Sequence, residues 1–312
     1  MENHSHKKVL FILLQFFAFG CCFMNGVEWD CASSTTTSIF TRSTNCTITG
    51  NNHVAVTNTL EINGTNTDMN NLITITAANN QRHFYLNDAN AKLILRYLKL
   101  VGGDVSSYKT SPDRYGGSIL IYTNGGELNL YSSIVFNNKA DVGGGIYARG
   151  ASSTNKNAIM NIFDSIIHNN EAGYGGGIRT SYAFVTIYNT TIDNNQAGDN
   201  GGGMVILRSH VTMKNTIISN NNAGLNGGGL DIEGDSTVTL RQSSFINNDA
   251  TNNGDEIYTE SSPTISLINT YFNNPNNNNI YESNGPPTWK TCSDNLCTEE
   301  PFTGTCNQLN NN

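Results

Sequence analysis

The sequence is poor in charged residues. Aspartate, glutamate, lysine and arginine together make up 13% of its 312 residues. Helical proteins cover their surfaces with glutamate, lysine and arginine, so this scarcity disfavours a helical fold. The formal net charge is -8 and the isoelectric point is near 5.2. Nucleic acids and anionic membranes attract basic surfaces, so we expect neither as a partner.

The chain has only one long apolar run. The run extends from Val9 to Phe19 and follows a basic stretch at His6, Lys7 and Lys8. A transmembrane helix needs about 20 apolar residues, whereas a basic start before a short apolar core is typical of a secretory signal peptide. We therefore expect residues 1–22 to be a signal peptide. The mature protein is then secreted or at the cell surface and has no transmembrane segment.

Cysteine is absent from the whole middle of the chain. Outside the expected signal peptide, the cysteines stand near the two ends, at Cys31, Cys46, Cys292, Cys297 and Cys306. An oxidising compartment favours disulfides, and we expect Cys31 to pair with Cys46 and one pair to form among the last three. No Cys-x-x-Cys or paired histidine accompanies them, so we expect no metal site and no cofactor. In a eukaryotic source, the sequons at Asn45, Asn63 and Asn189 are glycosylation candidates.

Glycine, in contrast, recurs in a regular pattern. A glycine-rich turn is closed each time by an apolar residue, and successive closing residues are 27, 32, 26, 26 and 27 positions apart. The closing residues are Ile119, Ile146, Ile178, Met204, Leu230 and Ile257. A fixed period of this length is the signature of a repeat architecture.

Asparagine marks the same period. A pattern Ser/Thr-x-hydrophobic-x-x-Asn-x-Ala precedes the glycine turns, and in the last copy Pro275 stands where asparagine is expected. The asparagines are Asn138, Asn170, Asn195, Asn221 and Asn248. If the repeats stack, these side chains form a column in which each amide hydrogen-bonds the next, which satisfies groups that are costly to bury.

Short runs of alternating apolar and polar residues predict strands in every unit. Examples are Val185-x-Ile187, Val211-x-Met213 and Val238-x-Leu240. Such a unit buries its apolar side only by stacking on its neighbours. The sequence therefore predicts an all-β protein, a right-handed single-stranded parallel β-helix of roughly nine coils. We expect an N-terminal cap at 23–50, the β-helix at 51–285 and a cysteine-containing cap or tail at 286–312.

The two markers also resemble a known family. The segments Gly227-Gly228-Gly229-Leu230 and Phe245-Ile246-Asn247-Asn248 resemble the repeats of the chlamydial polymorphic outer membrane proteins, and the coil pattern resembles the wider pectin-lyase-like superfamily. The resemblance covers about residues 90 to 275. It implies a surface-exposed rod used in adhesion or host contact.

Many members of that superfamily cleave or epimerise acidic polysaccharides, so such an enzyme is the alternative. Two outward columns of the predicted coils contain no stacked carboxylates: Tyr147, Arg179, Val205, Asp231, Tyr258, and Tyr188, Lys214, Arg241, Ile268. The weak catalytic candidates are His168 and Asp193, which fall one coil apart in one column.

Outward tyrosines offer a binding function without chemistry. Tyr147, Tyr188 and Tyr258 are candidates for stacking on sugar rings. We therefore expect a non-catalytic protein that takes part in adhesion or recognises a polysaccharide or a cell-surface partner.

Overall fold

The computed structural model describes residues 27–32, 38–48, 53–151, 157–273, 279–283, 288–293 and 296–299. Every regular element in these ranges is a β-strand. The strands form four sheets, which we call sheets A, B, C and D. The expected signal peptide and Cys306 lie outside the described residues.

Sheet A has 12 strands among the described residues, and all but the last pair are parallel. In spatial order they are β1 (Val27–Glu28), β2 (Ser38–Arg42), β5 (Thr59–Gly64), β8 (Lys92–Arg96), β11 (Gly126–Tyr131), β14 (Ala158–Phe163), β18 (Ala183–Tyr188), β22 (His210–Lys214), β26 (Thr237–Arg241), β30 (Thr264–Ile268), β33 (Thr288–Ser293) and β34 (Leu296–Glu299).

Sheets B and C each have nine parallel strands in the described ranges. Sheet B contains β3 (Cys46–Thr47), β6 (Ile73–Thr76), β9 (Leu98–Val101), β12 (Ile134–Phe136), β15 (Ile166–His168), β19 (Thr191–Asp193), β23 (Ile217–Ser219), β27 (Ser244–Ile246) and β31 (Tyr271–Asn273). Sheet C contains β4 (Val54–Val56), β7 (Phe84–Leu86), β10 (Ile119–Ile121), β13 (Ile146–Arg149), β17 (Ile178–Ser181), β21 (Met204–Leu207), β25 (Leu230–Glu233), β29 (Ile257–Glu260) and β32 (Ile280–Ser283).

The small sheet D has four strands in the described part of the chain. They are β16 (Glu171–Ala172), β20 (Gln196–Ala197), β24 (Asn222–Ala223) and β28 (Asp249–Ala250).

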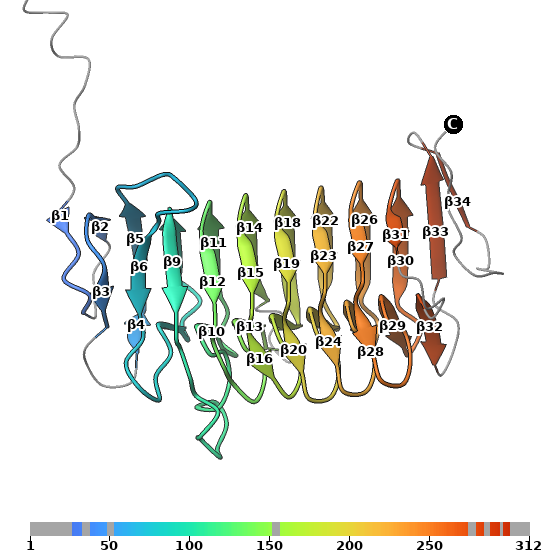
Figure 1. Cartoon of the computed structure of the whole chain (residues 1–312), viewed down its shortest axis with the longest axis horizontal. Coiled ribbons are helices and arrows are strands. Elements are labelled where there is room, and N and C mark those ends of the chain that lie inside the picture. The colour runs from blue at the N-terminus through green and yellow to red at the C-terminus, as the bar shows by residue number, and fades with distance from the viewer. Residues whose placement is uncertain are drawn as a thin grey trace, which may run out of the picture.

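From β2 onward the chain visits sheets A, B and C in turn and then starts the next coil, so like strands stack along one axis (Figure 1). Nine such coils are present in the described residues, which confirms the predicted parallel β-helix. Within 23–50, β2 pairs with β5 of sheet A and β3 pairs with β6 of sheet B. Within 286–312, β33 pairs with β30 of sheet A.

Alternation along each strand builds the core. In sheet A the inward positions carry apolar pairs such as Leu93 and Leu95, which lie in register with Leu128 and Leu130 of the next coil. These side chains are fully buried, as are the equivalent residues of later coils. Burial of apolar surface contributes about 25 cal/mol per Å², and stacking supplies it in every coil.

The glycine turns have a local steric cause. Gly201 has a φ of +67°, and a Cβ there would lie 2.3 Å from Val205 Cγ2. At the third glycine position, a Cβ on Gly177 would lie 3.0 Å from Cγ of Asn195, in the following coil. The two sequence markers are therefore coupled, because glycine leaves the space that the asparagine of the next coil fills.

The asparagine column is buried and continuously hydrogen-bonded. Each asparagine is 1% exposed. The Nδ2 of Asn170 donates to Oδ1 of Asn195 at 3.0 Å and to the carbonyl of Val135 at 3.1 Å. The backbone N–H of Asn170 also donates to that Oδ1, at 3.0 Å. The same pattern recurs from Asn138 to Asn248.

The N-terminal end is closed by a disulfide and an aromatic plug. Cys31 and Cys46 form the predicted disulfide, with their Cα atoms 6.4 Å apart. Trp29 is 1% exposed and stacks on Phe84, with ring centroids 5.9 Å apart. These contacts cover the N-terminal end of the core among the described residues.

Candidate functional site

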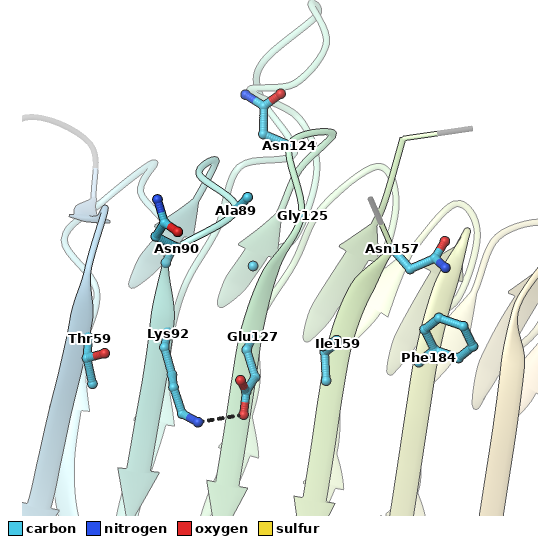
Figure 2. Close-up of a pocket in the computed structure, with 12 residues that line it drawn as sticks. Thr59, Ala89, Asn90, Lys92, Asn124, Gly125, Glu127, Asn157, Ile159 and Phe184 are labelled. Atoms are coloured by element: carbon cyan, nitrogen blue, oxygen red, sulfur yellow. Dashed lines mark ion pairs between the residues drawn. The ribbon is translucent and has the colours of Figure 1, made fainter. Parts of the chain in front are cut away.

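A cleft of about 400 Å³ opens on the outer face of sheet A, across five successive strands from β5 to β18 (Figure 2). The outward residues nearest the start of each strand form one row, namely Thr59, Lys92, Glu127, Ile159 and Phe184. Loop residues complete the lining: Ala89, Asn90, Ala91, Asn124, Gly125, Gly126 and Asn157. Its volume lies within the usual range for small-molecule sites.

The polar part of the cleft is an ordered network. Lys92 Nζ lies 2.9 Å from Glu127 Oε1 (Figure 2). The Nδ2 of Asn129 donates to the same oxygen at 2.7 Å, and the Nδ2 of Asn161 donates to Oδ1 of Asn129 at 3.0 Å. Partial burial acts to raise the pKa of Glu127, but these donors and the charge of Lys92 lower it below its usual value. Glu127 is therefore held as an ion.

The apolar part of the cleft is accessible. Ile159 and Phe184 are 39% and 47% exposed, and the Phe184 ring lies 5.1 Å from the His210 ring. Amide groups beside open apolar surface suit a ligand that carries hydroxyl groups on an apolar ring face, as a sugar does.

A second line of rings lies on the same outer face, at the C-terminal ends of these strands. Tyr131 stacks on Phe163 with centroids 5.2 Å apart, and Arg96 lies 4.0 Å above the Tyr131 ring. Tyr188 follows Phe163 in register and is 37% exposed. The predicted binding residue Tyr188 therefore shares the face of sheet A with the cleft.

The other two predicted tyrosines are buried. Tyr147 is 5% exposed and Tyr258 is 7% exposed. Their register with Arg179 and Asp231 agrees with the predicted column, but the Tyr115 ring packs edge-on to Tyr147 at 5.4 Å, and Tyr281 stacks on Tyr258 at 5.7 Å. Neither side chain presents an open ring face to a ligand.

His168 and Asp193 lie opposite each other on β15 and β19. No hydrogen bond joins them within the described residues. His168 packs on Phe136 with ring centroids 4.5 Å apart, and burial lowers its pKa. Asp193 accepts hydrogen bonds from Ser219 at 2.7 Å and Asn220 at 2.8 Å. The arrangement gives the imidazole no carboxylate partner to activate it as a base.

A polar cleft of about 500 Å³ lies next to this pair. It is lined by Asn79, Asn80, Gly102, Asp104, Asn137, Asn138, Lys139, Asn169 and Glu171. Lys139 and Glu171 form an ion pair at 2.6 Å. Lys139 and Glu171 therefore compensate each other, Asp104 leaves the lining with one negative charge, and none of the lining residues carries a ring.

The outer face of sheet C holds carboxyl groups that the sequence reading overlooked. The sequence analysis compared one outward column of this sheet, which includes Asp231, and the other outward column contains Glu233 beside Glu260. Asp231, on the same strand as Glu233, is 0% exposed, and neither of its carboxyl oxygens accepts a hydrogen bond from a described residue. Burial and the charge of Glu233 raise the pKa of Asp231 well above its usual value.

The remaining candidates lie on the surface or at the ends. Asn45 and Asn189 are exposed, and Asn63 is partly buried. The Nδ2 of Asn189 donates to Asp164 at 2.7 Å, and that of Asn63 donates to Glu61 at 3.1 Å. The backbone pairing of β33 and β34 places Cys292 opposite Cys297.

A scan against protein-family models found no match, and searches of the curated proteins and of the solved structures found none either. In the described ranges, no group of three or more histidine, cysteine, aspartate or glutamate side chains is placed to hold a metal ion. No helix long and apolar enough to cross a membrane occurs in the same ranges. The functional argument therefore depends on the surface chemistry of the coils.

Proposed function

We propose that this protein is a secreted or cell-surface β-helix that binds a glycan along the outer face of sheet A and takes part in adhesion. The observation that carries the proposal is the cleft in Figure 2, where the exposed Phe184 and Ile159 lie beside asparagine side chains. The β-helix is the fold that the resemblance to chlamydial surface proteins implies, and this agreement supports a surface role.

Binding is favoured over catalysis because of the state of the carboxyl group in the cleft. A polysaccharide hydrolase needs a second carboxyl group, and one of the pair must hold a proton as the general acid. Glu127 is the one carboxyl side chain among the residues that line this cleft, and Lys92 and Asn129 keep it ionised. We therefore propose that the face recognises its glycan without cleaving it.

The test is binding of the purified protein to a glycan array, with Phe184→Ala combined with Tyr188→Ala as the variant. Loss of two exposed rings is expected to weaken binding about tenfold, because aromatic stacking contributes about 0.5–1.5 kcal/mol for each contact. Tyr271→Ala is the matched control, since Tyr271 is an equally exposed ring on sheet B.

Unchanged binding by the double variant, or equal loss in the control, would exclude sheet A as the glycan-binding face. Release of shortened or unsaturated sugar products from a bound polysaccharide would show that the polysaccharide-active alternative is right.

A further inference from the structure

We propose that the outer face of sheet C binds the oxyanion of an acidic glycan, a carboxylate or a sulfate ester, through Arg149 and Arg179. The inference deepens the glycan recognition proposed above, on which it rests, by adding a second surface with a defined ligand chemistry.

The two arginines lie close together by the register of the coils. Tyr147 on β13 is opposite Arg179 on β17, and Arg149 is opposite Ser181. The arginines are therefore on neighbouring strands and offset by two residues, so both point outward. With strands about 4.8 Å apart and a rise of about 3.3 Å per residue, their Cα atoms are about 8 Å apart. Two flexible guanidinium groups at this separation can reach one anionic group.

Both guanidinium groups lack a carboxylate partner. Within the described residues, neither Arg149 nor Arg179 makes an ion pair or a hydrogen bond. The contrast with other arginines of this acidic chain is clear, because four of them form ion pairs: Arg42 with Glu28, Arg96 with Glu61, Arg114 with Asp141 and Arg208 with Asp235. Arg149 and Arg179 are thus the two arginines of sheet C with open donor capacity.

Tyrosine rings orient the two side chains. Arg149 lies 5.4 Å from the centre of the Tyr122 ring, and Arg179 lies 5.4 Å from that of Tyr174. A cation–π contact occupies the flat face of the guanidinium and leaves its N–H edges free. Those edges match the two oxygens of a carboxylate or a sulfate. Tyr174 is 40% exposed, so its ring is also open to a sugar.

Carboxyl groups lie near the two arginines without forming an ion pair with either in the described part of the chain. Asp199 hydrogen-bonds Tyr174, and Glu233 is three strands further on in the column of Arg149. The nearest carboxyl group along the column of Arg179 is Asp231, two strands further on. Burial raises the pKa of that carboxyl, so it keeps its proton to higher pH than usual and neutralises Arg179 less. Arg114 lies over Tyr115 at 5.4 Å. Although burial acts to raise the pKa of Tyr115, hydrogen bonds from Ser111 and Arg114 and the charges of Arg114 and Arg149 lower it.

The test measures binding of the full chain to three immobilised polymers: polygalacturonic acid, which carries carboxylates, dextran sulfate, which carries sulfate esters, and neutral dextran. The variants are Arg149→Gln with Arg179→Gln, and Arg149→Lys with Arg179→Lys. Lys99→Gln with Lys139→Gln is the control, because it removes the same charge from residues outside sheets A and C. Thermal unfolding of each variant confirms that the β-helix is intact.

The wild-type protein is expected to bind one or both acidic polymers, more weakly at high salt, and not neutral dextran through this face. The glutamine pair should lose tenfold or more in affinity, because charge-assisted hydrogen bonds are the strong ones. The lysine pair should recover only part of it, because lysine lacks the planar fork. The polymer that binds identifies the carboxylate or the sulfate as the ligand group.

Equal losses in the glutamine pair and in the control would reduce the effect to net charge and overturn the proposal, as would a wild-type protein that binds neither acidic polymer. Failure of the proposed function gives a different pattern. There, Phe184→Ala with Tyr188→Ala leaves glycan binding unchanged, while the arginine variants still lose the acidic polymers.

Discussion

The regular coils and the first coils use different side chains to hydrogen-bond the same buried groups, the backbone carbonyls of sheet B. From Asn138 onward, each asparagine caps a backbone carbonyl of sheet B in the preceding coil. One coil earlier, Gly103 stands where the asparagine would be. The carbonyl of Ile75 is instead capped by His83, whose Nε2 lies 3.1 Å away. An imidazole replaces an amide.

At the other end of the asparagine column, a different side chain again takes the place of an asparagine. Pro275 occupies the next asparagine position in the sequence, and it lies outside the described residues. Glu256 stands where earlier turns have their third glycine, and its Oε2 accepts a hydrogen bond from Nδ2 of Asn248. At the N-terminal end, His83 and Ser118 stand at the same turn position, because Phe84, Ile119 and Ile146 lie in register. Side chains therefore occupy the third turn position where the asparagine column ends, and glycines occupy it where the column continues. The comparison shows that the column needs a partner in every coil, and that the partner need not be asparagine.

The largest expected effect comes from breaking the column in its regular part. Asn195→Leu leaves the Nδ2 and backbone N–H of Asn170 and the carbonyl of Ile167 without the bonds they now make. Each unsatisfied buried group costs about 1–3 kcal/mol, so the free energy of unfolding should fall by about 3 kcal/mol or more. Chemical denaturation measures it.

The control for this prediction is Gln196→Leu. Gln196 is the next residue along the chain and is exposed on sheet D, so its replacement should change the stability by less than about 0.5 kcal/mol. A loss of the same size in both variants would mean that leucine harms the strand pairing and that the buried amide is not the cause.

The repeat could be read from the sequence because its cause is local. A glycine at each turn and an asparagine in each coil recur at the coil period, and the alternation within Val185–Ile187 predicts a strand directly. His83 and Glu256 could not be read in this way, because each replaces a residue of another coil. Their roles depend on which residues stack, and that register follows only from the assembled coils.

The candidate sites were harder to predict for a related reason. Alternation places Tyr147 and Asp231 on the outer side of sheet C, but it does not say what covers them. Their burial depends on neighbouring residues such as Tyr115, which reaches Tyr147 from the preceding turn. The cleft on sheet A depends on loops at Asn90, Asn124 and Asn157, which carry no period at all.

The second expected effect separates the imidazole from the amides by pH. Complete burial lowers the pKa of His83 from 6.5 to about 4. The unfolded chain then binds the proton more readily than the folded protein does. The stability that neutral His83 contributes is therefore complete above pH 6.5 and is lost as the pH falls towards 4. The loss amounts to about 3 kcal/mol, at 1.36 kcal/mol for each unit of pKa. Asparagine has no such dependence.

Denaturation of the wild type and of His83→Gln is measured between pH 7 and pH 4, and the free energy of unfolding of each is plotted against pH. The difference between the two slopes gives the contribution of His83. His210→Gln is the control, because His210 is exposed on sheet A. Carboxyl groups titrate in the same range in all three proteins and cancel in the comparison. Parallel slopes for the wild type and His83→Gln would show that the imidazole does not titrate across folding.

The smallest expected effect concerns Asp231. This carboxyl group is buried outside the asparagine column, and its oxygens accept no hydrogen bond from a described residue. Its pKa is raised in the folded state, so the folded protein binds the proton more readily. Stability is therefore complete below the unfolded value of 3.8 and falls as the pH rises through the folded pKa. Asp231→Asn removes the charge and should raise the free energy of unfolding by about 1 kcal/mol at pH 8. At pH 4, where the carboxyl group is already neutral, it should change little.

Asp249→Asn is the control for this difference, because Asp249 is exposed on β28 of the next coil. A lower stability of Asp231→Asn at pH 8 would mean that the ionised carboxylate is well compensated in the folded protein, with Arg179 as the nearby cation. Asp231 would then reduce the positive charge available to a ligand at Arg179. The sign of this small change therefore tests both the unsatisfied group and the anion site, because a neutral Asp231 leaves Arg179 free and a charged one does not.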